Sequence, residues 1–169
     1  RILQLMNRGL TKKQIAALVE KIRKNIKGCV IRTSVMAGFP TETVDEFKEL
    51  LSFLKETRFQ RLGAFTYSRE ENTPAFKLEP QVNNRDKSRR FREIMSLQQA
   101  ISCDTNKQFI GKEIDVLVEE KDNDVFIGRT QFDAYEVDGV VFLKKKGLKT
   151  GNFYKAKIVD SYDYDLVGI

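Results

Sequence analysis

The sequence predicts an α/β part followed by a small all-β barrel. Residues 1–108 alternate helical and strand-like patterns in the order helix, strand, helix, strand, helix, which is typical of a parallel sheet. After Gly111 the hydrophobic period changes to two. A charge step accompanies this change, because residues 1–108 hold 21 Lys and Arg against 12 Asp and Glu, whereas residues 109–169 hold 9 against 12. We therefore expect two domains, at 1–108 and 109–169.

The first long helix is marked by a capping box. Thr11 supplies the N-cap hydroxyl and a glutamine stands three residues later. Apolar residues then follow at helical spacing until Gly28, which ends the helix. The pattern at residues 29–36 predicts a strand, one face of which carries Arg32 and Ser34.

A second capping box, Thr43 with Glu46, begins the next helix. A short strand is predicted at 62–66, a polar loop at 67–83 and a long helix at about 84–109. Two strands cannot close a core of their own. We therefore expect further strands before residue 1, an exposed apolar seam in this part of the chain, and a chain that is a fragment.

The remainder of the chain carries strand patterns separated by turn residues. Five short strands in so small a domain predict a closed, OB-like β-barrel. The expected strands lie around Ile114–Val118 and at Val125–Phe132, Gly139–Leu143, Phe153–Val159 and Tyr162–Val167.

Composition excludes several kinds of site. The chain has no histidine, which excludes Ser/His/Asp and Cys/His catalysis and removes the commonest metal ligand. Cys29 and Cys103 lack the spacing of a zinc or cluster motif, and reduced thiols in a cytosolic protein are expected. No apolar run is long enough to span a membrane, and no signal peptide is visible.

Two loops carry the strongest functional signal. Residues 37–43 connect the first strand to a helix, and Tyr67 and Ser68 directly follow the second strand. Ligands of α/β folds bind at loops that leave the carboxyl ends of strands. The sequence therefore predicts half of a ligand site, with the other half outside this chain.

These motifs resemble the radical S-adenosylmethionine methylthiotransferases. The resemblance rests on Gly-Phe-Pro-x-Glu-Thr at 38–43 with Asp-Glu-Phe at 45–47, and on Phe-Thr-Tyr-Ser at 65–68 with Thr-Pro-Ala at 73–75. A long helix followed by a small barrel looks like a TRAM domain. The hairpin at 128–139 is similar to that of the RimO-type branch, which modifies an aspartate of small-subunit ribosomal protein twelve.

Two positions depart from the family pattern. Thr41 stands where the family usually has glycine, and Tyr135 where the hairpin usually has proline. Threonine is poorly suited to a positive φ, so we expect the loop to use an ordinary backbone conformation at Thr41.

The resemblance implies the C-terminal portion of a partial (β/α) radical SAM barrel joined to a TRAM barrel. It implies an enzyme that adds a methylthio group to the β-carbon of an aspartate, after a 5′-deoxyadenosyl radical abstracts hydrogen from that carbon. The implied cofactors are S-adenosylmethionine and two [4Fe-4S] clusters. The CxxxCxxC motif that holds one cluster is absent, so no catalytic or metal-binding residue is expected here, and the chain should be inactive alone.

Several residues are candidates for the cofactor site, each with a structural alternative. Arg32 either pairs with a carboxylate of S-adenosylmethionine or substrate, or forms an ion pair with another part of the protein. Residues 38–43 form either a wall beside the adenosyl group, with Glu42 as an open acceptor, or a plain connection. The expected cofactor-binding residues are Arg32, Ser34, Gly38, Phe39, Pro40, Glu42, Tyr67 and Ser68.

The acidic balance of residues 109–169 favours a basic protein partner over RNA, because RNA binding draws on Lys and Arg. The expected substrate-binding residues are Arg129, Asp133, Glu136 and Asp138. Two alternatives remain, a MiaB-like enzyme acting on a tRNA adenosine and a non-catalytic RNA-binding module. We interpret the lysines at 144–146 as a solvated hairpin tip, and the basic cluster at 85–92 as the solvated face of the long helix. A cytoplasmic monomer is expected.

Overall fold

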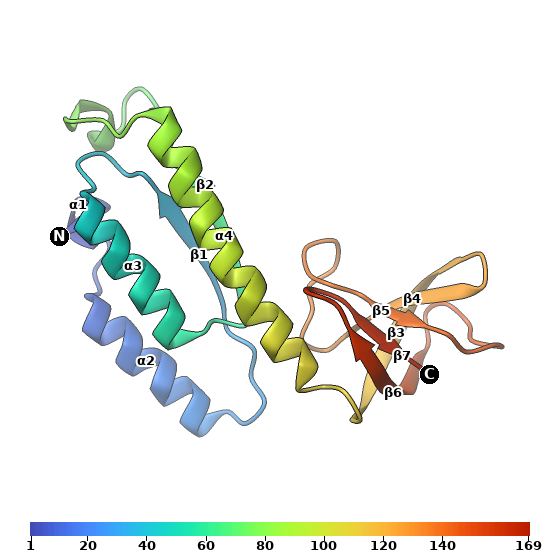
Figure 1. Cartoon of the computed structure of the whole chain (residues 1–169). Coiled ribbons are helices and arrows are strands. Elements are labelled where there is room, and N and C mark those ends of the chain that lie inside the picture. The colour runs from blue at the N-terminus through green and yellow to red at the C-terminus, as the bar shows by residue number, and fades with distance from the viewer. The chain divides into compact units, whose positions relative to one another are not determined.

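The computed structural model describes residues 1–169 and divides them into two compact units, Arg1–Gln98 and Gln99–Ile169 (Figure 1). Helix α4 (Asn84–Lys107) contributes residues to both units. The predicted boundary between residues 108 and 109 falls just after this helix, whereas residues 99–107 group with the barrel.

The first unit contains the predicted alternation of helices and strands. Both predicted capping boxes are confirmed, with Thr11 and Gln14 at the start of one helix and Thr43 and Glu46 at the start of another. A short helix at the amino end and a 3-10 turn in the loop were not predicted. The elements before α4 are α1 (Ile2–Leu5), α2 (Lys12–Asn25), β1 (Arg32–Ala37), α3 (Val44–Thr57), β2 (Arg61–Thr66) and η1 (Pro74–Lys77).

The two strands of this unit pair in parallel, as predicted. The strand predicted at 29–36 is displaced and runs from Arg32 to Ala37. Ile31 lies just before the strand, where its N–H donates to the side chain of Gln60 at 3.2 Å and its carbonyl accepts the Arg61 N–H at 3.3 Å. The predicted strand at 62–66 is confirmed, with one more residue at its start.

Helices cover one face of this two-stranded sheet, as Figure 1 shows for α3 and α4. Val35, Leu62 and Ala64 on that face pack against the apolar core of the unit. The core is built around side chains that are almost completely buried, among them Phe47, Leu54 and Ile94. Because α2, α3 and α4 all pack on the same side, no helix of this chain covers the opposite face of the sheet.

The second unit is a closed five-stranded barrel, so this part of the predicted fold class is confirmed. The strand order around the barrel is β3-β4-β5-β7-β6. All neighbours are antiparallel except β5 and β7, which pair in parallel. The strands are β3 (Glu113–Asp122), β4 (Val125–Thr130), β5 (Val141–Leu143), β6 (Phe153–Ser161) and β7 (Leu166–Gly168).

Alternate residues of these strands fill the barrel interior. Val116, Val118 and Ile158 are fully buried there. Gly128 on β4 allows two strands to approach closely, because a Cβ at this position would lie 2.4 Å from the carbonyl oxygen of Leu117. Of the helices, none has both the length and the apolar composition needed to cross a lipid bilayer.

Candidate functional site

The carboxyl ends of β1 and β2 lie side by side. The parallel register pairs Met36 with Phe65 and Ala37 with Thr66. The Tyr67 N–H extends the ladder by donating to the Ala37 carbonyl, at 3.0 Å. Both predicted loops therefore leave the sheet at the same edge, which is where α/β folds place ligand sites.

The loop after β1 adopts a strained conformation at Thr41. Its φ is 67°, so the expectation of an ordinary conformation at this position is wrong. The conformation is held from two sides. The Thr41 N–H donates to the Pro80 carbonyl at 2.9 Å, and the Arg1 guanidinium donates to the Thr41 hydroxyl and carbonyl at 2.8 Å each. A strained residue persists where its surroundings determine its conformation in this way.

Replacing Thr41 with glycine is expected to give a more stable protein than replacing it with alanine, because both variants lose the hydroxyl that Arg1 bonds. Glycine adopts a positive φ without the steric cost that a β-branched residue bears, and the relief is worth about 1 kcal/mol. The matched control is Thr41→Ala, which also loses the hydroxyl but keeps a Cβ. Urea unfolding should place the glycine variant above the alanine variant in free energy of unfolding. Equal stabilities would show that Thr41 is not strained.

Arg1 also contacts the first turn of α3. Its guanidinium donates to both carboxylate oxygens of Glu46, at 2.7 and 2.6 Å, and the same carboxylate accepts the Thr43 N–H at 2.9 Å. Hydrogen bonds from Arg1 lower the pKa of Glu46 from 4.5 to about 2. Arg1 thus links the loop to the start of α3 through the Glu46 carboxylate, which stays ionised in mild acid.

The lowered pKa of Glu46 predicts a pH dependence of stability. A carboxylate whose folded pKa lies below its unfolded value adds stability above the unfolded pKa, and this stability is lost as the pH falls through the folded pKa. As the pH falls from about 4.5 to about 2, the difference in free energy of unfolding between the wild type and Glu46→Gln should become smaller. Asp45→Asn, at an exposed neighbour, is the control. A difference that does not change with pH would contradict the assignment.

Glu42 lies inside the loop, and one oxygen of its carboxylate is engaged there. One carboxylate oxygen accepts the Gly38 N–H at 3.0 Å and also pairs with a guanidinium nitrogen of Arg90. Both side chains of this ion pair are only 4% exposed. Burial raises the pKa of Glu42, while Arg90 and the Gly38 N–H oppose that rise. Glu42 therefore uses one carboxylate oxygen within the loop and on Arg90, and its role as an acceptor for a cofactor stays a prediction.

Lys87 connects the loop after β1 with the end of β2. Its Nζ donates to the Tyr67 carbonyl at 3.0 Å and lies 5.0 Å from the centre of the Tyr67 ring. The Tyr67 ring packs edge-on against Phe39, with ring centres 5.4 Å apart. The Tyr67 hydroxyl is buried and has no hydrogen-bond partner. A ligand or a water molecule can supply the hydrogen bond that this buried hydroxyl lacks.

The structure brings together most, but not all, of the predicted cofactor residues. Ser68 is exposed and bonds Glu70 at 2.6 Å. Arg32 begins β1 and Ser34 follows two residues later on the same open face, so Arg32 stands at the opposite end of the strand from the loop. The residues that do cluster at the carboxyl ends are Gly38, Phe39, Pro40, Glu42 and Tyr67.

Lys87 and Arg90 are the site residues that sequence reasoning missed. They belong to the basic cluster at 85–92, which was read as a solvated face of the long helix. That reading is wrong for these two residues, since Lys87 is 8% exposed and Arg90 4% exposed. Their neighbour Arg89 does lie at the surface, where it pairs with Asp86 and Glu93. The sequence offered only the spacing of three residues, which places Lys87 and Arg90 on one helix face.

An apolar groove of about 1400 Å³ opens beside β1 in the first unit. It matches the expected apolar seam. Its lining comes from α1, α2, α3 and the two strands, and includes Ile2, Leu10, Ile15, Val35, Phe53 and Phe65.

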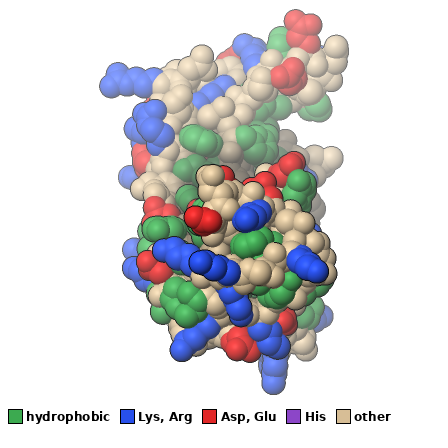
Figure 2. Space-filling view, turned by 90° about the vertical axis from the view of Figure 1, so that its right-hand side faces the viewer, with side chains coloured by type: hydrophobic (Ala, Val, Ile, Leu, Met, Phe, Trp, Pro, Cys, Tyr) green, Lys and Arg blue, Asp and Glu red, His purple; other side chains and the backbone are tan.

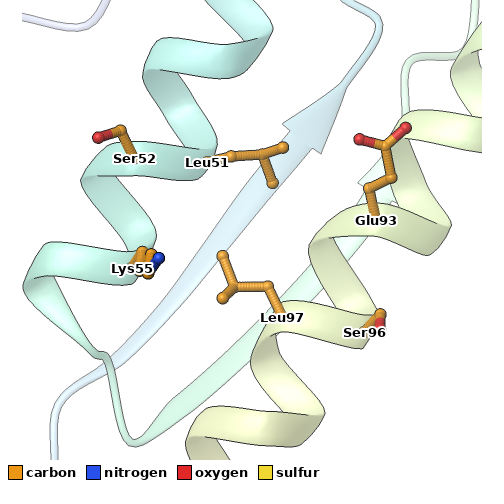
Figure 3. Close-up of a pocket in the computed structure, with 6 residues that line it drawn as sticks. All are labelled: Leu51, Ser52, Lys55, Glu93, Ser96 and Leu97. Carbon is orange, nitrogen blue, oxygen red and sulfur yellow. The ribbon is translucent and has the colours of Figure 1, made fainter.

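A second hollow, of about 590 Å³, lies between α3 and α4 (Figure 3). Leu51 and Leu97 point toward one another across it, and Lys55 and Glu93 stand at its rim. Its lining contains no unpartnered buried polar atom. The hollow is therefore a weaker candidate for a ligand site than the loops at the ends of β1 and β2.

The predicted substrate residues of the barrel differ in exposure. Asp133 is buried and accepts the Thr130 hydroxyl at 2.6 Å. Arg129 pairs with Glu119 at 2.7 Å, and Asp138 accepts the Ala134 N–H at 2.8 Å. Glu136 is exposed in the turn. Asp133 and Asp138 thus bond within the hairpin, and Glu136, which bonds the neighbouring Tyr135 side chain, is the most exposed of the three carboxylates.

Lysines of the barrel gather near the end of β7. The Lys144 N–H donates to the Gly168 carbonyl, and Lys157 exchanges two backbone hydrogen bonds with Ile169. Lys155 lies on the same face of β6 but is 3.6 Å from Asp115 and 4.0 Å from Glu113. Figure 2 shows Lys and Arg side chains on this part of the molecule among hydrophobic and acidic ones. The barrel surface is therefore mixed in charge.

Comparison with known proteins gives two results. Residues 110–169 match the family model of the TRAM domain. Nearly the whole chain, 99% of it, is 48% identical to the ribosomal protein uS12 methylthiotransferase RimO of Caldicellulosiruptor saccharolyticus. The corresponding proteins of Desulforamulus reducens and Clostridioides difficile are 46% and 45% identical over the same share of the chain. The chain spans 38% of the length of each of these relatives. Over 99% of its length the chain is thus similar to the C-terminal part of the RimO proteins, and its residues 110–169 are similar to the TRAM domain.

Proposed function

We propose that this chain is part of a radical S-adenosylmethionine methylthiotransferase that modifies an aspartate of ribosomal protein uS12. The observation that carries the proposal is the 48% identity to a uS12 methylthiotransferase across 99% of the chain. It is supported by two family motifs that lie at adjacent carboxyl ends of parallel strands. The reaction would add a methylthio group to the β-carbon of the aspartate.

The residues at the ends of β1 and β2 fit one wall of an S-adenosylmethionine site. Phe39 and Pro40 are buried side chains that shape the loop from beneath, and the Tyr67 hydroxyl is a buried group without a partner. Ser34 and Phe65 lie on the open sheet face that leads to them. When bound, S-adenosylmethionine supplies the radical that takes hydrogen from the substrate. The role of this chain is to bind and orient the cofactor and to exclude water from one side of it.

The iron-sulfur clusters do not fit residues of this chain. No group of three or more His, Cys, Asp or Glu could hold a metal ion, and Cys29 and Cys103 stand singly. Cluster ligands would come from the part of the longer protein that this chain does not span. The groove beside β1 offers apolar surface and a free strand edge against which such a part would pack.

The barrel would contact the protein substrate. Its exposed Glu136 suits a basic ribosomal protein, whose attraction to acidic surface raises the rate of encounter. The lysines near the end of β7 favour a second candidate, a tRNA substrate. Because acidic residues of β3 stand beside Lys155, we rank the protein substrate first. Such an enzyme would act as a monomer in the cytoplasm, where ribosomes are made.

A competition experiment tests the choice of substrate. The longer protein is immobilised and offered purified uS12 and bulk tRNA at physiological salt. We expect retention of uS12, with weaker binding in Glu136→Lys, whose matched control is the exposed Glu120→Lys. Retention of tRNA that falls steeply as salt rises, with no retention of uS12, would favour the second candidate.

A further inference from the structure

Lys87 and Arg90 are two buried cations on α4, and the proposed function gives neither of them a role. They lie three residues apart on one face of the helix, and both reach the loops at the carboxyl ends of the strands. Buried Lys and Arg are rare in proteins unless a specific partner holds them. Their contacts therefore indicate what they do.

Arg90 fixes both ends of the loop after β1. One guanidinium nitrogen pairs with the Glu42 carboxylate and also donates to the Glu42 carbonyl at 3.1 Å. The same carboxylate oxygen accepts the Gly38 N–H at 3.0 Å. Through Glu42, which lies two residues before α3, Arg90 holds the first residue of the loop, Gly38.

Lys87 fixes the loop from the other side. Its aliphatic stem passes directly beside Gly38, where an added Cβ would lie 2.5 Å from the Lys87 Cγ. Its Nζ then donates to the Tyr67 carbonyl, in the loop after β2. One side chain thus sets the separation of the two loops, and any longer residue at position 38 would force them apart.

These contacts are a poor way to gain stability. Desolvating a buried ion pair costs about as much as the pairing returns, and well-packed apolar residues often serve as well or better. What such contacts do provide is a single arrangement of the groups that they join. Here they join the two loops that, on the proposed function, line the cofactor site.

We propose that Lys87 and Arg90 are positioning residues that hold the loops after β1 and β2 in the arrangement that binds S-adenosylmethionine. This inference rests on the proposed function. Neither side chain touches the cofactor. On the proposed function the cofactor lies against the two loops, and the two cations fix where these loops stand.

The test uses the full-length protein with its clusters reconstituted. The variant Arg90→Lys keeps the charge but removes the planar fork of donors, and Lys87→Met keeps the apolar stem but removes the ammonium. Arg89→Lys is the matched control, because Arg89 makes only surface pairs on the same helix. Equilibrium dialysis measures the Kd of S-adenosylmethionine, binding assays measure the Kd of uS12, and hydrogen exchange follows the amides of residues 38–43.

We expect each buried-site variant to raise the Kd of S-adenosylmethionine about tenfold, with the Kd of uS12 unchanged and faster exchange at residues 38–43. The control should change none of the three. An unchanged cofactor Kd in a folded variant would overturn the inference, as would equal losses for cofactor and uS12. If Arg90→Lys does not fold, Lys87→Met alone decides. Wild-type protein that fails to bind S-adenosylmethionine would overturn the proposed function itself, and the inference with it.

Discussion

Replacing Glu42 with alanine is expected to lower the free energy of unfolding by about 3 to 5 kcal/mol, because it leaves the Arg90 guanidinium buried without a counter-charge. The guanidinium is 4% exposed and cannot reach solvent without moving the loop. The Gly38 N–H would lose its acceptor as well, which adds the cost of an unsatisfied buried donor. Chemical denaturation of wild type and variant measures this loss.

A double variant separates the lost pairing from the lost packing. In Glu42→Leu with Arg90→Met, apolar groups of similar volume replace both charges, and most of the stability should return. Glu49→Ala is the surface control, since Glu49 pairs with Lys12 where both side chains are about half exposed. A loss for Glu42→Ala no larger than for Glu49→Ala would mean that the buried pair is unimportant for stability.

Replacing Gly128 with alanine is expected to destabilise the barrel by about 2 to 3 kcal/mol. The added Cβ would lie 2.4 Å from the Leu117 carbonyl oxygen and 2.8 Å from a methyl group of Val116. Backbone of the neighbouring strand would have to move, and β3 is held on its other side by β6. Loss of stability should therefore appear in the barrel.

The matched control for this clash is Gly63→Ala, also at a glycine within a strand. Nothing lies within 4 Å of a Cβ placed there, so stability should change little. Thermal unfolding of the two variants, with amide hydrogen exchange to locate the loss, makes the comparison. Similar melting temperatures for both variants would contradict the close approach of β3 and β4 at Gly128.

The elements that sequence predicted well are those determined locally. Thr11 and Thr43 cap their helices with groups three residues away, so both starts could be read from the sequence. Alternation of period two likewise located the barrel strands. The parallel closure of β5 on β7 could not be predicted, because it depends on pairing between residues far apart in the chain.

The position of the two loops was predicted, but their contacts were not. The rule that ligand loops follow strand ends pointed to residues 38–43 and Tyr67, which do lie at adjacent strand ends, and their role in binding a ligand stays a prediction. The positive φ of Thr41 could not be foreseen, because distant residues, Arg1 and Pro80, maintain it. Lys87 and Arg90 were missed because charged residues on an amphipathic helix are usually solvated, and only the fold brings Glu42 to Arg90.

The measurement that tests the account most directly is the mass of uS12 after incubation with the full-length protein, S-adenosylmethionine, a sulfur source and a reductant. We expect one aspartate-containing peptide to gain the mass of a single methylthio group less that of the hydrogen it replaces, and no change in tRNA treated in parallel. A methylthio group found on tRNA instead, or an unmodified uS12 with fully loaded enzyme, would contradict the account.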